Sequence, residues 1–381
     1  MESASMRLRI TMFAGTPPPT HGTSVAVRQL LQSKFSEEFD VRHINAQFAT
    51  QISEIDRLTT RKILLVAKYL TQLIWNILTF NPAYIIICPA FNRLSFLKDS
   101  VFIVVAGRIM RKRVLLWCHG NGLKDIHDRS SSFFRRFIEF VMKTAFCTIP
   151  VTRALPSENY QFFIDTSRIH PIHYGISNVI ITRSDLHSGH VTITYLSNMD
   201  LTKGWKVLVE ASIRLCERHQ NVIVNFYGGP AKNSPLDEIK GVFASTGFPT
   251  RIKYLGGVYG DKKIAALSET DIFCFPTYYP YESFGIVNLE AMRSGLPIVT
   301  TNFAGASEAV EDGLGGFLAK KEDVDDLVDK LEILIRDPQK RLSMGEYNRN
   351  RYLAEFTLES HVENWISLVR RLEAGVTKPK H

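Results

Sequence analysis

The chain lacks the cysteine spacing of a disulfide framework or a structural zinc site. Its five cysteines are scattered along 381 residues, and no two of them form a CxxC pair. Small disulfide-stabilised domains and zinc ribbons both need closely spaced cysteines. The pattern therefore indicates a reducing compartment, and we expect a cytoplasmic protein.

Other absences exclude further classes. The sequence has no GxGxxG fingerprint and no Walker loop, so an oxidoreductase of the dinucleotide-binding type is the least favoured class. The opening residues show no apolar stretch before a small-residue cleavage site, and no signal peptide is expected. The most apolar stretch, residues 63–80, is interrupted at helical spacing by Lys68, Gln72, Asn76 and Thr79. We expect a mostly buried helix here, because a membrane span needs about 20 predominantly apolar residues.

Positive charge is concentrated in the first half of the chain. Residues 1–190 hold 23 Lys and Arg against 13 Asp and Glu, whereas residues 191–381 hold 23 against 25. A basic half beside a near-neutral half indicates an anionic partner, such as lipid headgroups, a pyrophosphate-linked acceptor or nucleic acid.

The basic aromatic segment 133–146 resembles a nucleic-acid-binding or membrane-binding helix. Its apolar residues more simply form a core stripe, made by Phe133, Phe134, Phe137, Val141 and Ala145. The spacing of Arg135, Glu139 and Lys143 favours ion pairs on the opposite face. We therefore expect no nucleic-acid partner.

Strand and helix patterns alternate along both halves. Strand patterns cover residues 7–15, 39–45, 84–88, 114–118 and 147–152, then 191–197, 221–229, 251–257, 271–276 and 297–301. Helical patterns between and after them cover 61–79, 133–146, 205–218, 261–268, 285–294, 323–336 and 358–373. Such alternation predicts two parallel α/β arrays, and the polar stretch 177–190 is typical of a linker between them.

The densest group of chemistry-bearing residues is the string PTYYPYESFGIVNLEAMRSGLPIVTTNFAGASE (276–308). Pro276 ends a strand, so the loop holding Glu282 lies at the carboxyl edge of a parallel sheet, where ligands bind. Glu290 follows on a helix that begins near Gly285. Ionised carboxylates accept hydrogen bonds from the paired hydroxyls of a sugar ring. Taken singly the two glutamates are ordinary surface residues, but the whole string favours a binding site.

This string resembles the acid–seven–acid motif of the retaining, nucleotide-sugar-dependent glycosyltransferases of family 4. The similarity continues through EDGLGGFL (311–318) and covers most of residues 191–335. It implies the GT-B fold, an α/β architecture of two Rossmann-like domains facing each other across a cleft. By the same resemblance Glu290 holds the nucleotide ribose and Glu282 a hydroxyl of the donor sugar. The backbone amides of Phe284, Gly285 and Ile286 face the sugar and phosphates.

A second segment, YLSNMDLTKGWKVLVEA (195–211), resembles the phosphate-binding segment of that family. Lys203 and the glycine after it match the family's Lys-Gly pair. Ser197 and Asn198 stand where the family has Gly and Arg, so one phosphate-neutralising charge is missing. Lys203 can still bind a diphosphate as a point charge. Lys206 is a weak candidate for the second cation, the alternative being a solvated helix face.

Three other positions take roles from the resemblance. Gly22, in the loop after the first strand, corresponds to a glycine loop near the donor phosphates, although a simple proline-rich turn explains it when taken alone. His119 ends a buried strand and corresponds to a histidine beside the transferred sugar; a lone histidine is more often structural. Val258 lies near the backbone contacts expected for the nucleobase. His127, His170 and His173 belong to no motif.

One apparent metal motif has a simpler explanation. Asp323-Val324-Asp325 matches the DxD pattern of other glycosyltransferases, but it opens an amphipathic helix. Acidic residues there favour the positive end of the helix dipole. We therefore expect helix capping, no catalytic metal and no cofactor.

The resemblance thus implies an N-terminal acceptor domain at 1–180, with the helix 358–373 crossing back onto it, and a C-terminal donor domain at 190–355. The expected activity is transfer of a hexose-type sugar from a nucleotide diphosphate to a glycan or lipid-linked acceptor, in surface-polysaccharide or glycoconjugate synthesis. The basic half also favours contact with an anionic membrane, at the inner face of that membrane. The alternatives are a GT-B nucleotide-sugar epimerase and a non-catalytic nucleotide-sugar-binding protein.

Overall fold

The computed structural model describes residues 7–18, 22–48, 60–120, 122–153, 160, 162–179, 181, 189–280 and 282–377. The chain divides into two compact units. The first comprises Met1–Tyr174 together with Leu358–His381, and the second comprises Gly175–Thr357. The division between residues 174 and 175 therefore falls just before the stretch 177–190 that was expected to be the linker.

The first unit is built on a five-stranded parallel sheet with the order β2-β1-β3-β4-β5. Runs of β-branched and aromatic residues form these strands, and β3 and β5 are buried at every position, as in a parallel sheet covered on both faces. The strands are β1 (Arg9–Phe13), β2 (Asp40–Ile44), β3 (Tyr84–Ile87), β4 (Arg113–Cys118) and β5 (Cys147–Pro150).

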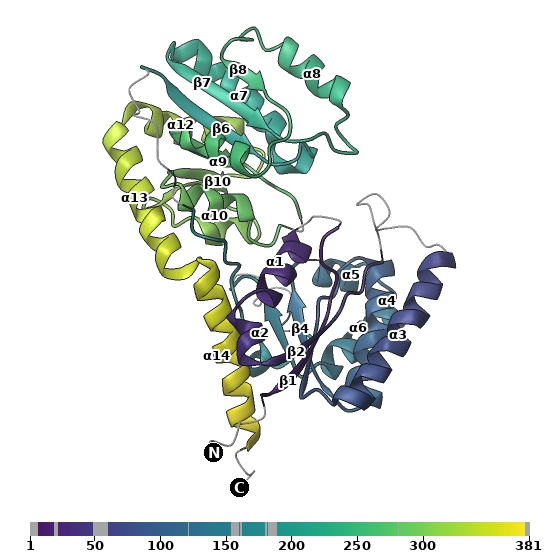
Figure 1. Cartoon of the computed structure of the whole chain (residues 1–381). Coiled ribbons are helices and arrows are strands. Elements are labelled where there is room, and N and C mark those ends of the chain that lie inside the picture. The colour runs from purple at the N-terminus through teal and green to yellow at the C-terminus, as the bar shows by residue number, and fades with distance from the viewer. Residues whose placement is uncertain are drawn as a thin grey trace, which may run out of the picture. The chain divides into compact units, whose positions relative to one another are not determined.

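Helices cover both faces of this sheet (Figure 1). One face is covered by α3 (Thr60–Phe80), α4 (Arg93–Val104), the π-helical turn η2 (Val105–Ile109) and α6 (Ser132–Thr144), whose inner side chains share one core with the strands. The opposite face carries α1 (Gly22–Leu31), α2 (Lys34–Glu38) and α14 (Leu358–Thr377).

Helix α3 is far more exposed than the sequence predicted. Only 28% of its apolar window is buried, and it is the one helix of the described residues that is long and apolar enough to cross a membrane. Its inner side is firmly packed, because Leu73 is fully buried and the Asn76 amide oxygen accepts a 2.6 Å hydrogen bond from the Thr11 hydroxyl. Its outer side carries Leu64 and Trp75, which are 72% and 69% exposed. The prediction of a mostly buried helix is therefore wrong.

Helix α6 departs from expectation in a similar way. Phe134, Val141 and Ala145 are buried as predicted, but Phe133 is 83% exposed. Phe133 lies in the first turn of α6, and it is the next residue, Phe134, that packs into the core shared with the sheet. Of the two expected ion pairs, Glu139 and Lys143 lie 3.9 Å apart, whereas the Arg135 guanidinium donates to backbone carbonyls of the preceding turn.

The second unit holds a six-stranded parallel sheet with the order β11-β10-β9-β6-β7-β8. The strands are β6 (Val191–Leu196), β7 (Val222–Tyr227), β8 (Ile252–Tyr254), β9 (Ile272–Phe275), β10 (Ile298–Thr301) and β11 (Gly316–Ala319). Helices α7 (Trp205–Arg218) and α12 (Val324–Arg336) pack together, as do α10 (Ile286–Arg293) and α13 (Pro338–Glu355). The remaining helices are α8 (Leu236–Ala244), α9 (Asp261–Ser268) and α11 (Ala306–Ala309). Of these elements, β11, α8, α11 and α13 were not predicted from the sequence.

Helix α14 is an integral part of the first unit. Trp365 is fully buried, with its ring centre 5.0 Å from that of Trp117 at the end of β4 and 6.1 Å from that of Phe35 in α2. His361, one turn earlier, is 3% exposed. Its Nδ1 donates a 2.5 Å hydrogen bond to the backbone carbonyl of His173.

The buried His361 makes stability depend on pH. Burial lowers the pKa of His361 to about 4, whereas the pKa of a histidine in the unfolded chain is about 6.5. Between these values the unfolded state binds more protons, so stability is lost as the pH falls. We expect this group alone to lower the free energy of unfolding by up to about 1.4 kcal/mol per pH unit, with a steeper loss between pH 6 and 5 than between pH 7 and 6, as measured by urea unfolding at pH 7, 6 and 5.

The variant His361→Asn is the control, because its amide nitrogen can still donate to the carbonyl but does not titrate. It should start from a lower stability and show a shallower dependence on pH than the wild type. Identical pH slopes in the two proteins would contradict the assignment.

Candidate active site

Two loops of the second unit leave the sheet side by side. Strands β6 and β9 are hydrogen-bonded neighbours and run parallel, so the loops after them, 197–204 and 276–285, emerge at the same carboxyl edge. The amide of Tyr278 donates a 2.8 Å hydrogen bond to the carbonyl of Thr202. The two loops are thus joined directly through their backbones.

An ion pair links side chains of these two loops. The Lys203 ammonium lies 2.5 Å from Oε2 of Glu282, and the two side chains are only 15% and 10% exposed. The Thr277 hydroxyl lies 3.4 Å from the same carboxylate oxygen. The ammonium also lies 4.3 Å from the centre of the Tyr279 ring. The edge therefore holds a cation that can bind an anion beside a carboxylate that can accept hydrogen bonds from hydroxyls.

Local backbone geometry explains why this lysine precedes a glycine. The Asp200 carboxylate accepts a 2.9 Å hydrogen bond from the Thr202 amide and begins the turn η5 (Leu201–Lys203). Gly204 then adopts a φ of 79°, and a Cβ there would lie 1.9 Å from the carbonyl oxygen of Pro276. Only glycine permits this approach of the two loops, which places Lys203 next to Glu282.

Glu290 lies on α10 and has a cation of its own. The Lys263 ammonium, from α9, lies 2.7 and 3.0 Å from its two carboxylate oxygens, and the side chains of Lys263 and Glu290 are 25% and 13% exposed. Lys263 was not predicted as a site residue, since nothing in the local sequence of α9 indicates which helix this lysine faces. The two glutamates predicted to act together thus have separate lysine partners.

The start of α10 is shaped by a buried aromatic residue and a left-handed glycine. Phe284 is fully buried, and its ring centre lies 5.4 Å from that of Phe356. Gly285 follows with a φ of 74°. The amides of Gly285 and Ile286 open the helix and have no acceptor within it. They are donors suited to a phosphate or a sugar hydroxyl.

Asn288 is a further residue that sequence reasoning missed. It is fully buried, and among the described residues neither polar atom of its side chain has a hydrogen-bond partner. Its Nδ2 lies 3.0 Å from the position that a Cβ on Gly285 would occupy. It therefore lies directly beneath the turn that presents the α10 amides.

Asn198 lies in the loop after β6 and Val258 in the loop after β8, and β7 lies between these two strands in the sheet. Asn198 is exposed, and its Oδ1 accepts a 3.3 Å hydrogen bond from the Ser197 hydroxyl. Lys206, the candidate second cation, instead pairs with Glu238 on α8 at 2.6 Å, with side chains 44% and 39% exposed. Val258 is half-buried in the loop between β8 and α9.

The two candidate residues of the first unit lie at the ends of elements. Gly22 is the first residue of α1, and residues 19–21 of the same loop lie outside the described residues. His119 follows β4 and is half-buried. Its Nδ1 is 2.5 Å from the Tyr174 hydroxyl, and its ring centre lies 4.4 Å from that of Trp117.

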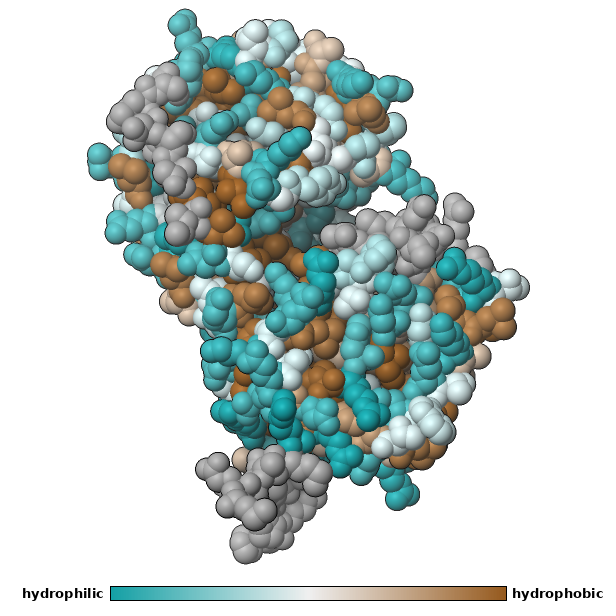
Figure 2. Space-filling model, viewed as in Figure 1, coloured by the Kyte–Doolittle hydropathy of each residue, from teal (hydrophilic) through white to brown (hydrophobic). Residues whose placement is uncertain are grey.

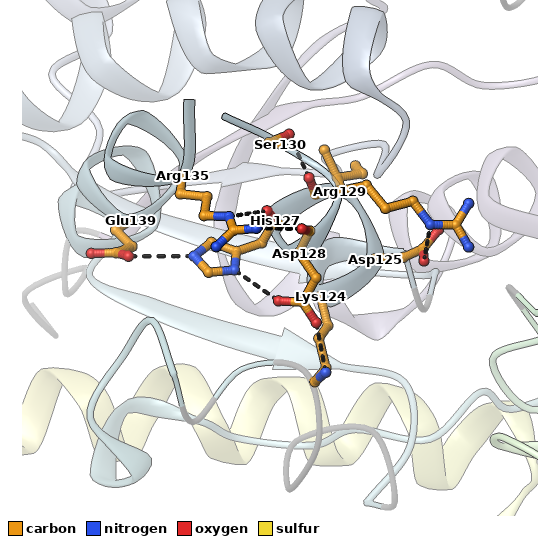
Figure 3. Close-up of polar contacts among 9 residues, drawn as sticks. Lys124, Asp125, His127, Asp128, Arg129, Ser130, Arg135 and Glu139 are labelled. Carbon is orange, nitrogen blue, oxygen red and sulfur yellow. Dashed lines mark hydrogen bonds and ion pairs between the residues drawn. The ribbon is translucent and has the colours of Figure 1, made fainter. Parts of the chain in front are cut away.

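His127 lies in a polar cluster between α5 (Leu123–Asp128) and α6 (Figure 3). Its Nδ1 is 3.1 Å from Asp128, and its Nε2 is 3.3 Å from Glu139. Arg135 donates to the backbone carbonyls of residues 127 and 128 at 3.0 and 2.5 Å. These contacts hold the end of α5 against α6, so the cluster is structural, in keeping with the lack of a motif around His127.

The DxD-like segment caps a helix, as predicted. The Asp323 carboxylate accepts a 2.9 Å hydrogen bond from the amide of Asp326 at the start of α12. The side chain of Asp325 pairs with Arg214 of α7. Both acids of the motif are thus accounted for by α12 and its neighbour.

Comparison with known proteins finds sequence relatives of the second unit. Residues 179–351 match the family described as "Glycosyl transferases group 1". D-inositol 3-phosphate glycosyltransferase of Corynebacterium jeikeium is 30% identical over 175 residues, which is 45% of this chain and 41% of that protein. The capsular polysaccharide biosynthesis glycosyltransferase CapM of Staphylococcus aureus is 27% identical over 173 residues, 45% of this chain and 44% of that protein. The chain therefore aligns with less than half the length of these curated relatives.

Solved structures resemble nearly the whole chain. Sucrose-phosphate synthase from Thermosynechococcus elongatus superposes with a TM-score of 0.76 at 17% identity, covering 97% of this chain and 100% of that one. Anabaena HepE in complex with UDP and glucose gives a TM-score of 0.72 at 18% identity, covering 96% and 100%. The second unit therefore matches the group 1 glycosyl transferases, and the two α/β units have the fold of GT-B glycosyltransferase structures.

Proposed function

We propose that the chain is a retaining glycosyltransferase of family 4, which moves a hexose-type sugar from a nucleotide diphosphate donor to a glycan or lipid-linked acceptor. The observation that carries this proposal is the Lys203–Glu282 ion pair, which sets a phosphate-binding cation beside a hydroxyl-binding carboxylate at 2.5 Å. The group 1 match over residues 179–351 supports it. So do the UDP-containing and UDP-glucose-containing complexes of HepE.

Different groups of the second unit bind the different parts of the donor. Lys203 binds the diphosphate and takes up the charge that develops as it departs. The amides that begin α10, from Phe284 to Ile286, donate to the same oxygens. Glu282 accepts a hydrogen bond from a sugar hydroxyl, Glu290 accepts from the ribose, and the loop at Val258 meets the nucleobase.

The reaction proceeds on the face of the sugar from which the diphosphate leaves. The acceptor hydroxyl oxygen bonds to the anomeric carbon, while the bond from that carbon to the diphosphate oxygen breaks. The acceptor proton passes to the departing phosphate oxygen, so no protein carboxylate needs to become a covalent nucleophile. The protein contributes positioning and electrostatic stabilisation, with His119 beside the transferred sugar and Gly22 near the phosphates.

The same proposal covers the setting of the reaction. Lys203 and the helix amides supply the positive charge that a metal provides in other transferases, so we propose transfer without a catalytic metal. The basic first half holds the acceptor, in surface-polysaccharide or glycoconjugate synthesis at the cytoplasmic side of a membrane. CapM, a glycosyltransferase of capsular polysaccharide biosynthesis, supports the choice of polysaccharide synthesis.

One observation favours a second candidate function. Asn198 leaves the loop after β6 without the expected second cation, as in a nucleotide-sugar-binding protein that has lost catalysis. Slow hydrolysis of the donor in the absence of acceptor, abolished in Glu282→Gln, would exclude that candidate. A change of the free nucleotide sugar into its epimer would favour a GT-B epimerase instead.

Glu282→Gln should separate catalysis from nucleotide binding. We expect kcat to fall by at least about 100-fold, because the sugar is no longer held in the reacting position. Nucleotide diphosphate affinity should stay within about threefold or tighten, since Lys203 loses its competing carboxylate. Transfer assays and calorimetry with UDP, GDP and ADP measure the two effects. Glu238→Gln, which breaks the exposed pair with Lys206, is the matched control and should change neither quantity.

Asn198→Arg tests the missing charge. Because Asn198 is exposed, an arginine fits there without repacking. It should lower the dissociation constant for the nucleoside diphosphate about fivefold, as measured by calorimetry. Asn198→Gln adds length without charge and should have no effect. An equal gain for the diphosphate and for the unphosphorylated nucleoside would disprove the phosphate assignment.

Glu290→Gln tests the ribose contact. Loss of a charged hydrogen-bond acceptor should weaken binding of the preferred nucleoside diphosphate about tenfold. The preferred base is first chosen by thermal shift across UDP-, GDP- and ADP-sugars. With the 2′,3′-dideoxy analogue, wild type and variant should bind alike. A tenfold difference that persists with the analogue would place Glu290 elsewhere.

A further inference from the structure

Exposed apolar side chains of the first unit are concentrated on one helical layer. Among the described residues of this unit, eleven large apolar side chains are exposed, and ten of them lie on α3, α4, η2 and α6. Figure 2 shows hydrophobic side chains gathered on the surface over α3. We call the solvent side of these four elements the outer helical face. Its most exposed members are Leu64, Trp75 and Leu78 of α3, Ile109 of η2 and Phe133 of α6, which are 67–83% exposed.

The same four elements are strongly basic. They contain nine Lys and Arg but only two acidic residues, Asp99 and Glu139. Asp99 is 5% exposed, accepts a hydrogen bond from the Ala90 amide and lies 2.9 Å from the Lys98 ammonium. Glu139 lies within ion-pair distance of Lys143 and His127. The outer helical face therefore combines apolar side chains with unbalanced positive charge.

A basic hollow adjoins this face where α3 and η2 end. It has a volume of about 440 Å³ and is lined by Arg7, Arg9, Arg111, Lys112, Arg113 and the backbone around Asn81. On one side of the hollow, the Arg113 guanidinium lies 3.4 Å from the Glu373 carboxylate. Burial and the neighbouring Arg9 charge lower the pKa of Lys112. A phosphate group would relieve this mutual repulsion.

The packing of α3 decides how it can meet a membrane. Its 21 residues would span about 31 Å, close to the thickness of a bilayer core. Leu73 and the Asn76–Thr11 hydrogen bond fix its inner side to the sheet, however, and Lys68 lies midway along its exposed side. A spanning helix would have to give up these contacts. An amphipathic helix lying in the plane of the interface keeps them.

We propose that the outer helical face docks on an anionic lipid bilayer, with α3 in the interface plane, the side chains of Trp75 and Leu78 inserted and the basic hollow holding lipid phosphates. This proposal stands independently of the sugar chemistry. Apolar insertion and anionic attraction act together in such binding. Both features occur together on this one layer of the first unit.

Tryptophan fluorescence offers a direct test on the full chain. Of the four tryptophans, Trp75 is 69% exposed, whereas Trp117, Trp205 and Trp365 are fully buried. Added vesicles of phosphatidylcholine with 30 mol% phosphatidylglycerol should therefore shift the emission of Trp75 to the blue. Lipids brominated near the headgroup should quench it more than lipids brominated near the bilayer centre. Stronger quenching from the bilayer centre, or no blue shift, would overturn the interfacial placement.

Vesicle flotation of variants measures separately how much the apolar side chains and the basic hollow contribute to lipid binding. Trp75→Ala/Leu78→Ala should raise the lipid concentration for half-binding at least about tenfold. Arg111→Gln/Lys112→Gln should raise it about tenfold at 0.1 M salt and much less at 1 M. The matched control is Leu342→Ala/Leu353→Ala, which removes two leucines of the second unit that are 48% and 44% exposed and should leave binding unchanged.

Light scattering and iodide quenching without lipid distinguish docking on lipid from association with a second copy of the chain. Light scattering without lipid should give a monomer, with Trp75 quenched freely by iodide. A dimer that protects Trp75 and is dissociated by Trp75→Ala/Leu78→Ala would assign the outer helical face to self-association and overturn the proposal. Equal binding of wild type and both variants, or equal binding to neutral vesicles, would overturn it as well.

Discussion

The candidate site depends on the ion pair between Lys203 and Glu282. These residues are 79 positions apart and meet because β6 and β9 are neighbours in a parallel sheet. Because Gly204 has no side chain, the carbonyl oxygen of Pro276 in the other loop can occupy the space that a Cβ would fill. Since each charge is largely shielded from water, removing one would leave the other without its partner. A ligand that replaces one partner must therefore supply charge or hydrogen bonds of the same kind, which an anionic sugar phosphate does.

Local patterns predicted those parts of the structure that local physics determines. The alternation of short strands and helices predicted ten of the eleven strands found in the described part of the chain, because buried parallel strands have a run of apolar residues. The acid motif and the Lys-Gly pair pointed to Glu282 and Lys203. Lys263 and Asn288 were not found, since their relevance arises from the neighbouring helix and turn rather than from their own segments. Helix α13 was missed because its polar sequence gives no strong apolar stripe.

The error over α3 has a different cause. Helical periodicity identified a polar stripe and correctly implied that the helix has distinct sides. It cannot reveal whether the remaining apolar side is covered by more protein or left at the surface, because that depends on what lies beyond the helix. The same holds for Phe133 at the start of α6, whose exposure is decided by one position in the first turn. Composition was a better guide here, since it located the excess positive charge in the half that contains this layer.

Helix α14 makes the first unit discontinuous in sequence. Trp365 fills a space between Trp117 and Phe35. The whole second unit, residues 175–357, is encoded between those two residues and Trp365. During synthesis the second unit can close its own core, whereas the first has one face of its sheet covered only by α1 and α2 until α14 leaves the ribosome. The first unit is thus translated first but can complete its core only last, so part of its apolar surface stays open to solvent while the second unit is being synthesised.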